Sequence, residues 1–279
     1  MKVDDTTIVS AFYPLPNSKH DTGKFRAWIQ NFCKIPCAMV IFTTEVYALE
    51  IMQWRRAFLD TTHVIVRPFD SFAMSCPSMM NFWQTQLNAQ SSPDFYAFCA
   101  MKQEFVRVAI NLNKFRSKWF VWCDIGIQRY SRLQEYYMTF PSEIERLCVP
   151  GRMTFLELNR IPESYITNWI EDKPMEYPMP ENLISAACMA GDADAWNELG
   201  ESYKEMLKEF AIRGWFAGKE SDVFFAILME KKAQTFRLFF AAPFGNPPVP
   251  GIEWLCFPVM LAGNMDAQLD TRFEPLHDN

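Results

Sequence analysis

Short apolar runs alternate with amphipathic segments along the first half of the chain. Four runs have the length and the β-branched or aromatic bias of buried strands: residues 6–13, 38–43, 63–66 and 119–123. Three segments between them carry apolar side chains at helical spacing: residues 24–33, 45–59 and 94–111. Such alternation is typical of a parallel sheet that is covered on both faces. The pattern therefore predicts an α/β fold with a mostly parallel central sheet flanked by helices on both faces.

The remaining segments are less regular. Residues 70–93 read as an irregular excursion with one helical turn, and residues 162–180 as a loop or short helices. Further helices and strands are expected as follows: helices at 131–150, 193–213 and 222–231, and strands at 153–158 and 236–241. Residues 183–190 form an apolar, small-residue run that Gly191 is expected to break. No segment resembles an interdomain linker, so residues 1–279 are predicted to form a single domain, with the proline-rich residues 242–279 wrapping its surface.

Composition narrows the class of protein. Apolar residues make up 49% of the chain and aromatic residues 15%, which is typical of a globular protein. The formal net charge is -6 and there is no long basic run, so nucleic-acid binding is disfavoured. The eight cysteines form no CxxC motif, and several lie within apolar runs, which favours buried free thiols in a reducing compartment. Neither a signal-peptide pattern nor an apolar stretch of about 20 residues is present, so a cytoplasmic protein without a transmembrane segment is expected.

The end of the 119–123 run is the strongest candidate for chemistry. The run stops abruptly at Asp124, and Gly126 follows two residues later. Open α/β sheets bind ligands at the carboxyl ends of their strands, and a glycine there allows a ligand to approach the backbone. A carboxylate at this position could hold a divalent metal that is bound to a diphosphate. The alternative is an aspartate that caps the following turn.

A second candidate is the end of the first predicted strand. Ser10, Phe12 and Tyr13 lie there, and Lys19 follows in a polar loop. Loops at this place bind nucleotides in doubly wound sheets, where an aromatic ring can stack on a base and a lysine can pair with a phosphate. The alternative is an ordinary proline turn.

Two later segments carry further candidates. Glu220 and Asp222 begin an apolar helix, and either carboxylate could act as a general base or simply favour the helix start through its dipole. In the segment 184–196, Asp192 or Asp194 is expected to be a helix N-cap. The small residues of that segment line a pocket or pack against the sheet. The chain contains no P-loop, no glycine-rich dinucleotide fingerprint and no Ser-His-Asp order.

Several segments together resemble a known family. TTIVSAFYPLPNSKH, followed by FRAWIQNF and AMVIFTT, resembles the start of the HtrL/YibB-like family, which is assigned to the glycosyltransferases. MKQEFVRVAINLNKFRSKWFVWCDIGIQR resembles its central signature of a helix, an Asn-x-Phe turn and a strand ending in Asp-x-Gly. AACMAGDADAW and GKESDVFFAIL resemble its later segments, in the same order.

The resemblance implies a GT-A-like fold of the nucleotide-diphospho-sugar transferase type. Residues 1–130 would be the nucleotide-binding half and residues 131–241 the acceptor half. Asp124 would bind Mn²⁺ or Mg²⁺ together with the diphosphate, while Lys102, Gly126 and Arg129 would lie near the nucleotide-sugar with the first-strand loop. Glu220 or Asp222 would activate the hydroxyl of a glycan or another acceptor.

Two departures from the family pattern leave an alternative open. Gly126 occupies the place of a second acid, and Ala186, Ala187 and Met189 occupy places where the family tends to have Gly and Phe. A degenerate, non-catalytic binding protein of the same fold is therefore the second hypothesis. A third is a metal-dependent phosphoryl transferase or nucleotidase, which would need a second acid beside Asp124.

Overall fold

In the computed structural model, the part of the chain that is described comprises residues 5–15, 22–86, 91–171, 173–175, 177–180, 182–231, 236–241 and 253–274. The strands are β1 Thr6–Phe12, β2 Ala38–Thr43, β3 Thr62–Val66, β4 Trp119–Cys123, β5 Met153–Glu157, β6 Ile184–Asp192, β7 Phe236–Ala241 and β8 Ala267–Leu269. The α-helices are α1 Thr22–Phe32, α2 Glu45–Trp54, α3 Pro77–Thr85, α4 Pro93–Ala100, α5 Lys102–Leu112, α6 Ile144–Leu147, α7 Glu163–Ile170, α8 Ala193–Arg213, α9 Glu220–Lys231 and α10 Cys256–Leu261. Short 3₁₀ helices are η1 Arg56–Thr61, η2 Phe69–Ser71, η3 Ala73–Ser75, η4 Ser131–Tyr137, η5 Glu253–Leu255 and η6 Thr271–Phe273.

The strands of the described chain form one mixed eight-stranded sheet in the order β3-β2-β1-β4-β6-β5-β7-β8. Strands β1 to β4 pair in parallel, and β6 is antiparallel to both β4 and β5. Strand β7 is parallel to β5 and β8 is antiparallel to β7. All strands except β6 and β8 therefore run in the same direction, which confirms the predicted mostly parallel sheet. The carboxyl ends of β1, β4 and β5 meet the amino end of β6 at one edge of the sheet.

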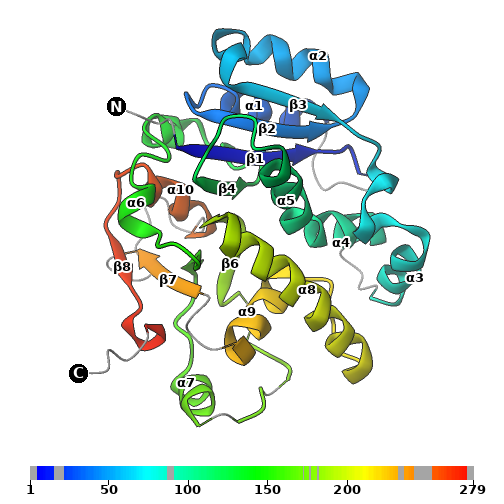
Figure 1. Cartoon of the computed structure of the whole chain (residues 1–279), viewed down its shortest axis with the longest axis vertical. Helices are drawn as coiled ribbons and strands as arrows, with labels where there is room; N and C mark the ends of the chain where they lie inside the picture. The colour runs from blue at the N-terminus through cyan, green and yellow to red at the C-terminus, as the bar shows by residue number, and fades with distance from the viewer. Residues whose placement is uncertain are drawn as a thin grey trace.

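Helices cover both faces of the sheet, as the sequence predicts (Figure 1). One core lies under α3, α4, α5, α7, α8 and α9, and the other lies under α1, α2, α6 and α10. Successive residues of β1 alternate between the two, because neighbouring side chains of a strand point to opposite faces. Ile8 belongs to one core and Val9 to the other. Within the described residues, no helix is long and apolar enough to cross a membrane.

One expectation for the sequence after residue 180 is wrong. Gly191 does not break the apolar run, because β6 continues through it to Asp192. A side chain at Gly191 would meet Met153 Sδ at 2.8 Å, so glycine here allows β6 to pack closely against β5. In the described part of the C-terminal segment, residues 253–274, every residue of α10 is buried. Asp192 is the N-cap of α8, as expected, and accepts a hydrogen bond from the Ala195 amide at 2.9 Å.

Before residue 150, the helices of the structure differ in their bounds from those that the sequence predicts. The predicted helix 94–111 is split into α4 and α5 at Met101, and the predicted helix 45–59 ends at Trp54. The irregular excursion contains a full helix, α3, which begins at Pro77. Residues 131–150 hold only the 3₁₀ helix η4 and the short α6.

Arg55 anchors the turn between α1 and β2. Its fully buried guanidinium donates hydrogen bonds to the carbonyls of Cys33, Ile35 and Cys37 and to Thr62 Oγ1. The Ile35 carbonyl also accepts from the Cys37 amide at 3.0 Å. One buried side chain thus pairs with three carbonyls that burial would otherwise penalise.

We expect Arg55→Met to destabilise the protein by about 3 kcal/mol, because it removes the guanidinium donors from three carbonyls and from Thr62 Oγ1. The measurement is urea unfolding. Arg56→Met is the matched control, since Arg56 is exposed and its loss should change the free energy of unfolding by less than about 0.5 kcal/mol. Equal stability of the two variants would contradict this role for Arg55.

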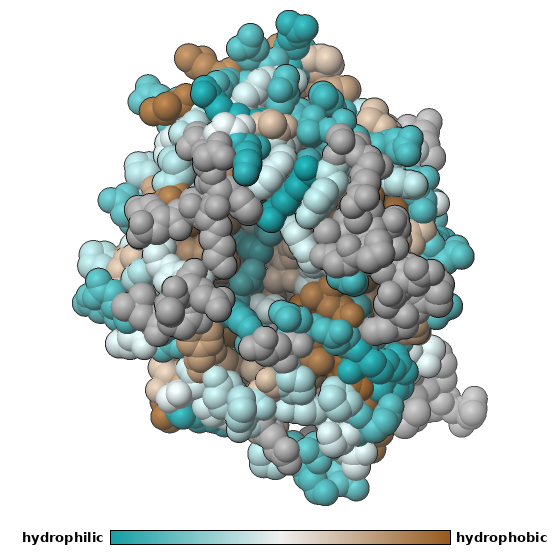
Figure 2. Space-filling model, turned by 180° about the vertical axis from the view of Figure 1, so that it is seen from behind, coloured by the Kyte–Doolittle hydropathy of each residue, from teal (hydrophilic) through white to brown (hydrophobic). Residues whose placement is uncertain are grey.

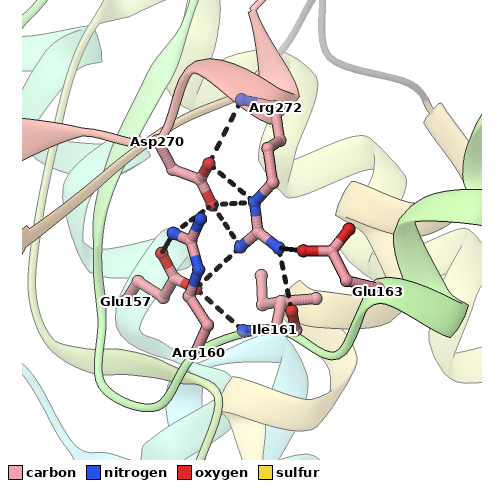
Figure 3. Close-up of polar contacts among 6 residues, drawn as sticks. All are labelled: Glu157, Arg160, Ile161, Glu163, Asp270 and Arg272. Atoms are coloured by element: carbon pink, nitrogen blue, oxygen red, sulfur yellow. Dashed lines mark hydrogen bonds and ion pairs between the residues drawn. The ribbon is translucent and has the colours of Figure 1, made fainter.

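An ionic cluster around the buried carboxyl groups of Glu157 and Asp270 joins the end of β5 to the segment that follows β8 (Figure 3). The Arg272 guanidinium contacts Asp270 at 2.7 Å, Glu163 at 2.8 Å and Glu157 at 3.3 Å. Arg160 lies 3.4 Å from Asp270. Burial raises the pKa of Glu157 to about 7, and the nearby Asp270 adds to this shift while the Ile161 amide and both arginines oppose it. With Glu157 protonated, two arginines balance the two remaining carboxylates.

This cluster predicts a pH dependence of stability. The pKa of Glu157 is raised from 4.5 in the folded state, so its contribution is complete below pH 4.5 and is lost as the pH rises through about 7. Relative to Glu157→Gln, the native protein should lose about 3 kcal/mol of stability between pH 4.5 and pH 8. Urea unfolding of both proteins across this range measures the difference. A difference that stays constant, or grows with pH, would contradict the prediction.

Candidate active site

Asp124 lies at the carboxyl edge of the sheet, directly after β4. Its amide donates to the Ala187 carbonyl of β6 at 2.8 Å, and its own carbonyl accepts from the Ile127 amide at 2.9 Å. Ser10 of β1 ties the neighbouring strand to the same place, because its hydroxyl donates to the Cys123 carbonyl at 2.5 Å. The backbone around Asp124 is therefore fixed by the strands on both sides.

A buried lysine joins two of the predicted site residues. Lys102 begins α5, and its Nζ lies 3.0 Å from Asp124 Oδ1 and 2.8 Å from Glu220 Oε1. The third partner is the Ala186 carbonyl of β6, at 3.0 Å. An ammonium group has three hydrogens, so these contacts use every donor of Lys102. Its side chain is only 4% exposed, which makes Lys102 a bridge between two carboxylates and leaves it no donor for a ligand.

The bridge sets the charge of the site. Burial would raise the pKa of Glu220, but the attraction and hydrogen bond of the Lys102 ammonium outweigh it and hold that pKa below its usual value. Burial likewise disfavours the Lys102 ammonium, yet Asp124 and Glu220 raise its pKa overall. Two carboxylates around one ammonium leave one net negative charge. Cys99 of α4 adds a hydrogen bond to Glu220.

Asp124 presents one oxygen outward. Its Oδ1 accepts from both Lys102 and the indole of Trp122, the latter at 2.9 Å. Its side chain is 27% exposed, and no described residue hydrogen-bonds to Oδ2. The carboxylate is thus held on one side and open on the other.

Arg129, in the loop after Asp124, packs against two tryptophans. Its guanidinium carbon is 4.9 Å from the ring centre of Trp28 in α1 and 4.8 Å from that of Trp254 in η5. Its Nε donates to the Gly126 carbonyl at 2.9 Å. Burial lowers the pKa of Arg129, and the charge of Asp124 opposes that shift. Asp124 is therefore close enough for its charge to act on Arg129.

Gly126 is buried next to aromatic side chains of α1. A side chain built on it would meet Trp28 at 3.5 Å and Phe25 at 3.6 Å. These are ordinary contact distances, so the position faces aromatic rings of α1. An acid at this position would point toward those rings.

The first-strand residues are part of the cores. Phe12 is buried against Phe25 and Tyr47, and Tyr13 is buried among aromatic rings of the opposite face. The Tyr13 hydroxyl donates to the Arg67 carbonyl at 2.9 Å. Ser10, also fully buried, uses its hydroxyl within the sheet. Base stacking by these rings is therefore not supported by their positions, and Lys19 lies outside the described residues.

The structure adds residues to the site that the sequence did not single out. Trp28, Trp254, Trp122 and Cys99 contact the site from four different elements. Only Trp122 had a local signal, since it lies two residues before Asp124 in the strand. Asp222 is half-buried in the first turn of α9, where it was predicted.

The donor set allows one protein ligand for a divalent metal. The described residues contain no group of three or more His, Cys, Asp or Glu side chains that could hold a metal. Mg²⁺ and related ions are commonly held by one or two carboxylates together with substrate phosphates and water. The outward oxygen of Asp124 fits that pattern, whereas the space between Asp124 and Glu220 is filled by the Lys102 ammonium.

The surface offers a recess. Figure 2 shows the face opposite to that of Figure 1, which is hollowed near its centre, with hydrophilic residues in the floor of the hollow.

No family model matches the chain, and no curated protein matches it. Among solved structures, the chain is similar to the apo form of mouse xyloside xylosyltransferase 1, with 11% sequence identity and a TM-score of 0.46. The match covers 83% of this chain and 84% of that one. The fold and the candidate site of the present chain define an α/β protein with a carboxylate–lysine–carboxylate bridge at the carboxyl edge of its sheet.

Lys102→Met should destabilise the protein by about 3–5 kcal/mol at pH 8, because it leaves buried carboxylates without a counter-charge. The loss should be smaller at pH 5, where an unpaired Glu220 with a raised pKa can be protonated. Adding Glu220→Gln should restore part of the stability. Urea unfolding at both pH values measures these effects, and Lys204→Met, at a half-exposed position, is the control. An equal loss at both pH values without rescue would contradict the bridge.

Proposed function

We propose that the protein is a glycosyltransferase that transfers a sugar from a nucleotide-diphospho-sugar to an acceptor hydroxyl with the help of a divalent metal. One observation carries the proposal: a fixed carboxylate, Asp124, presents a single open oxygen at the carboxyl edge of a mostly parallel sheet. Ligands of open α/β sheets bind at this edge. Membership of the HtrL/YibB-like family, a GT-A-like fold and a cytoplasmic location are parts of the same proposal.

Asp124 would hold Mn²⁺ or Mg²⁺ through its outward oxygen, with the diphosphate of the donor supplying further ligands. When bound, the metal stabilises the negative charge that develops on the departing diphosphate. Lys102 and Trp122 fix the orientation of Asp124, so the open oxygen is presented in one direction. Such preorganisation avoids a rearrangement during the reaction.

Glu220 and Asp222 take different roles in this proposal. Glu220 is a positioning residue, because its carboxylate is paired with Lys102 and its lowered pKa makes it a weak proton acceptor. Asp222 stays the proposed base, which would take the proton of the acceptor hydroxyl. Lys102 would position both carboxylates without contacting the nucleotide-sugar, which Asp124, Arg129 and the metal would bind.

A non-catalytic binding protein of the same fold is the second candidate. It is favoured by Ala186 and Ala187, which are buried in β6 beside Asp124 where the family pattern has other residues. It would bind nucleotide-sugars without turnover. The nucleotidase hypothesis is disfavoured, because the second acid near Asp124 is bridged to it by an ammonium group.

Asp124→Asn tests the proposal. The amide keeps the size of the side chain but lacks the charge that a metal requires, so donor cleavage should fall about a hundredfold or more. Thermal shift with UDP-, GDP- and TDP-sugars, with and without Mn²⁺, should show stabilisation of the native protein and a much smaller effect on the variant. Release of nucleoside diphosphate measures turnover.

Asp60→Asn, at an exposed position in η1, is the matched control and should behave as the native protein. Absence of stabilisation by every donor, together with an unchanged Asp124→Asn variant, would refute the proposal. Binding that depends on Asp124 without any turnover would favour the non-catalytic candidate.

A further inference from the structure

The Arg129 guanidinium is packed against two aromatic rings. Its central carbon lies over the rings of Trp28 and Trp254, 4.9 Å and 4.8 Å from their centres, and the two tryptophans come from opposite ends of the chain. The N–H groups of a guanidinium lie in its plane, and an aromatic ring beneath it offers them no strong acceptor. The two ring contacts and the hydrogen bond of Nε restrict the side chain before any ligand arrives.

Most of the donors at that edge have no partner. Nε is bonded to the Gly126 carbonyl, but no described residue accepts a hydrogen bond from the terminal nitrogens or forms an ion pair with them. The side chain is half-buried, so water replaces these partners less well than it would at an open surface. A planar pair of free N–H donors matches two oxygens of a phosphate or a carboxylate.

Asp124 lies near enough for its charge to act on Arg129, and the two are joined by a short turn. The Ile127 amide closes this turn on the Asp124 carbonyl at 2.9 Å. A diphosphate whose metal is held at Asp124 would therefore lie close to the free edge of Arg129. A direct ion pair between Asp124 and Arg129 does not compete with it, because none is formed.

We propose that Arg129, packed against Trp28 and Trp254, forms an oxyanion subsite that binds the diphosphate of the donor through its terminal nitrogens. This inference rests on the proposed function. Trp28 and Trp254 are positioning residues in it, since they hold the guanidinium and do not touch the anion. The subsite supplies a positive charge on the side of the diphosphate that the metal at Asp124 does not cover.

The test uses inorganic pyrophosphate as the probe, measured by isothermal titration calorimetry with and without Mn²⁺. Arg129→Gln should weaken pyrophosphate binding at least tenfold, and Arg129→Lys, which keeps the charge but not the planar edge, should weaken it less. Trp28→Leu should weaken it through Arg129 and add little to Arg129→Gln in the double variant. Arg146→Gln, at an exposed arginine paired with Glu143, should leave it unchanged.

Three results would overturn the inference: no binding of pyrophosphate to the native protein at millimolar concentration, unchanged binding in folded Arg129→Gln and Arg129→Lys, or an Arg129-dependent site for glucuronate alone. The last result would assign the subsite to a sugar carboxylate. Failure of the proposed function is distinguishable, because it would appear as absent donor cleavage while Arg129-dependent pyrophosphate binding persists.

Discussion

The Lys102 ammonium lies between the carboxylates of Asp124 and Glu220, and this buried bridge determines how the site is built. Two carboxylates close together beneath the edge of a sheet would repel each other and resist burial. One ammonium with three acceptors removes that conflict and ties α5, β4, β6 and α9 to one point. The bridge also decides which oxygen of Asp124 is available, because Oδ1 is held inside and Oδ2 faces outward.

The C-terminal segment contributes to the site, to one core and to the sheet. Its Trp254 packs against Arg129, its helix α10 is buried in one core, and its strand β8 joins the sheet. Arg272, which also pairs with Asp270 of the same segment, anchors the far end of that segment to the carboxyl end of β5 through Glu157. Ionic contacts and packing therefore hold one segment against strands that come much earlier in the chain. Since β4 and β5 run in the same direction, their ends lie at the same edge of the sheet.

A donor diphosphate is well matched to these groups. Asp124 offers one oxygen to a metal, and Arg129 offers planar donors to an oxyanion. The metal on the diphosphate and the oxygens of the diphosphate would therefore be bound by residues of one loop. Glu220, by contrast, stabilises Lys102. The division separates residues that would touch the ligand from those that position them.

Local patterns were sufficient for elements whose signals lie within a few residues. β2, β4, β7 and α8 have the bounds that apolar runs and helical spacing predict, and Asp124 and Asp192 lie where the strand end and the helix start place them. Periodicity cannot reveal that Lys102 contacts Glu220, or that Trp254 covers Arg129, because these pairs are brought together only by strand order and packing. For the same reason Phe12 and Tyr13, which look like binding residues at a strand end, are core residues: helices cover the sheet on both faces, and burial of the rings follows from that cover.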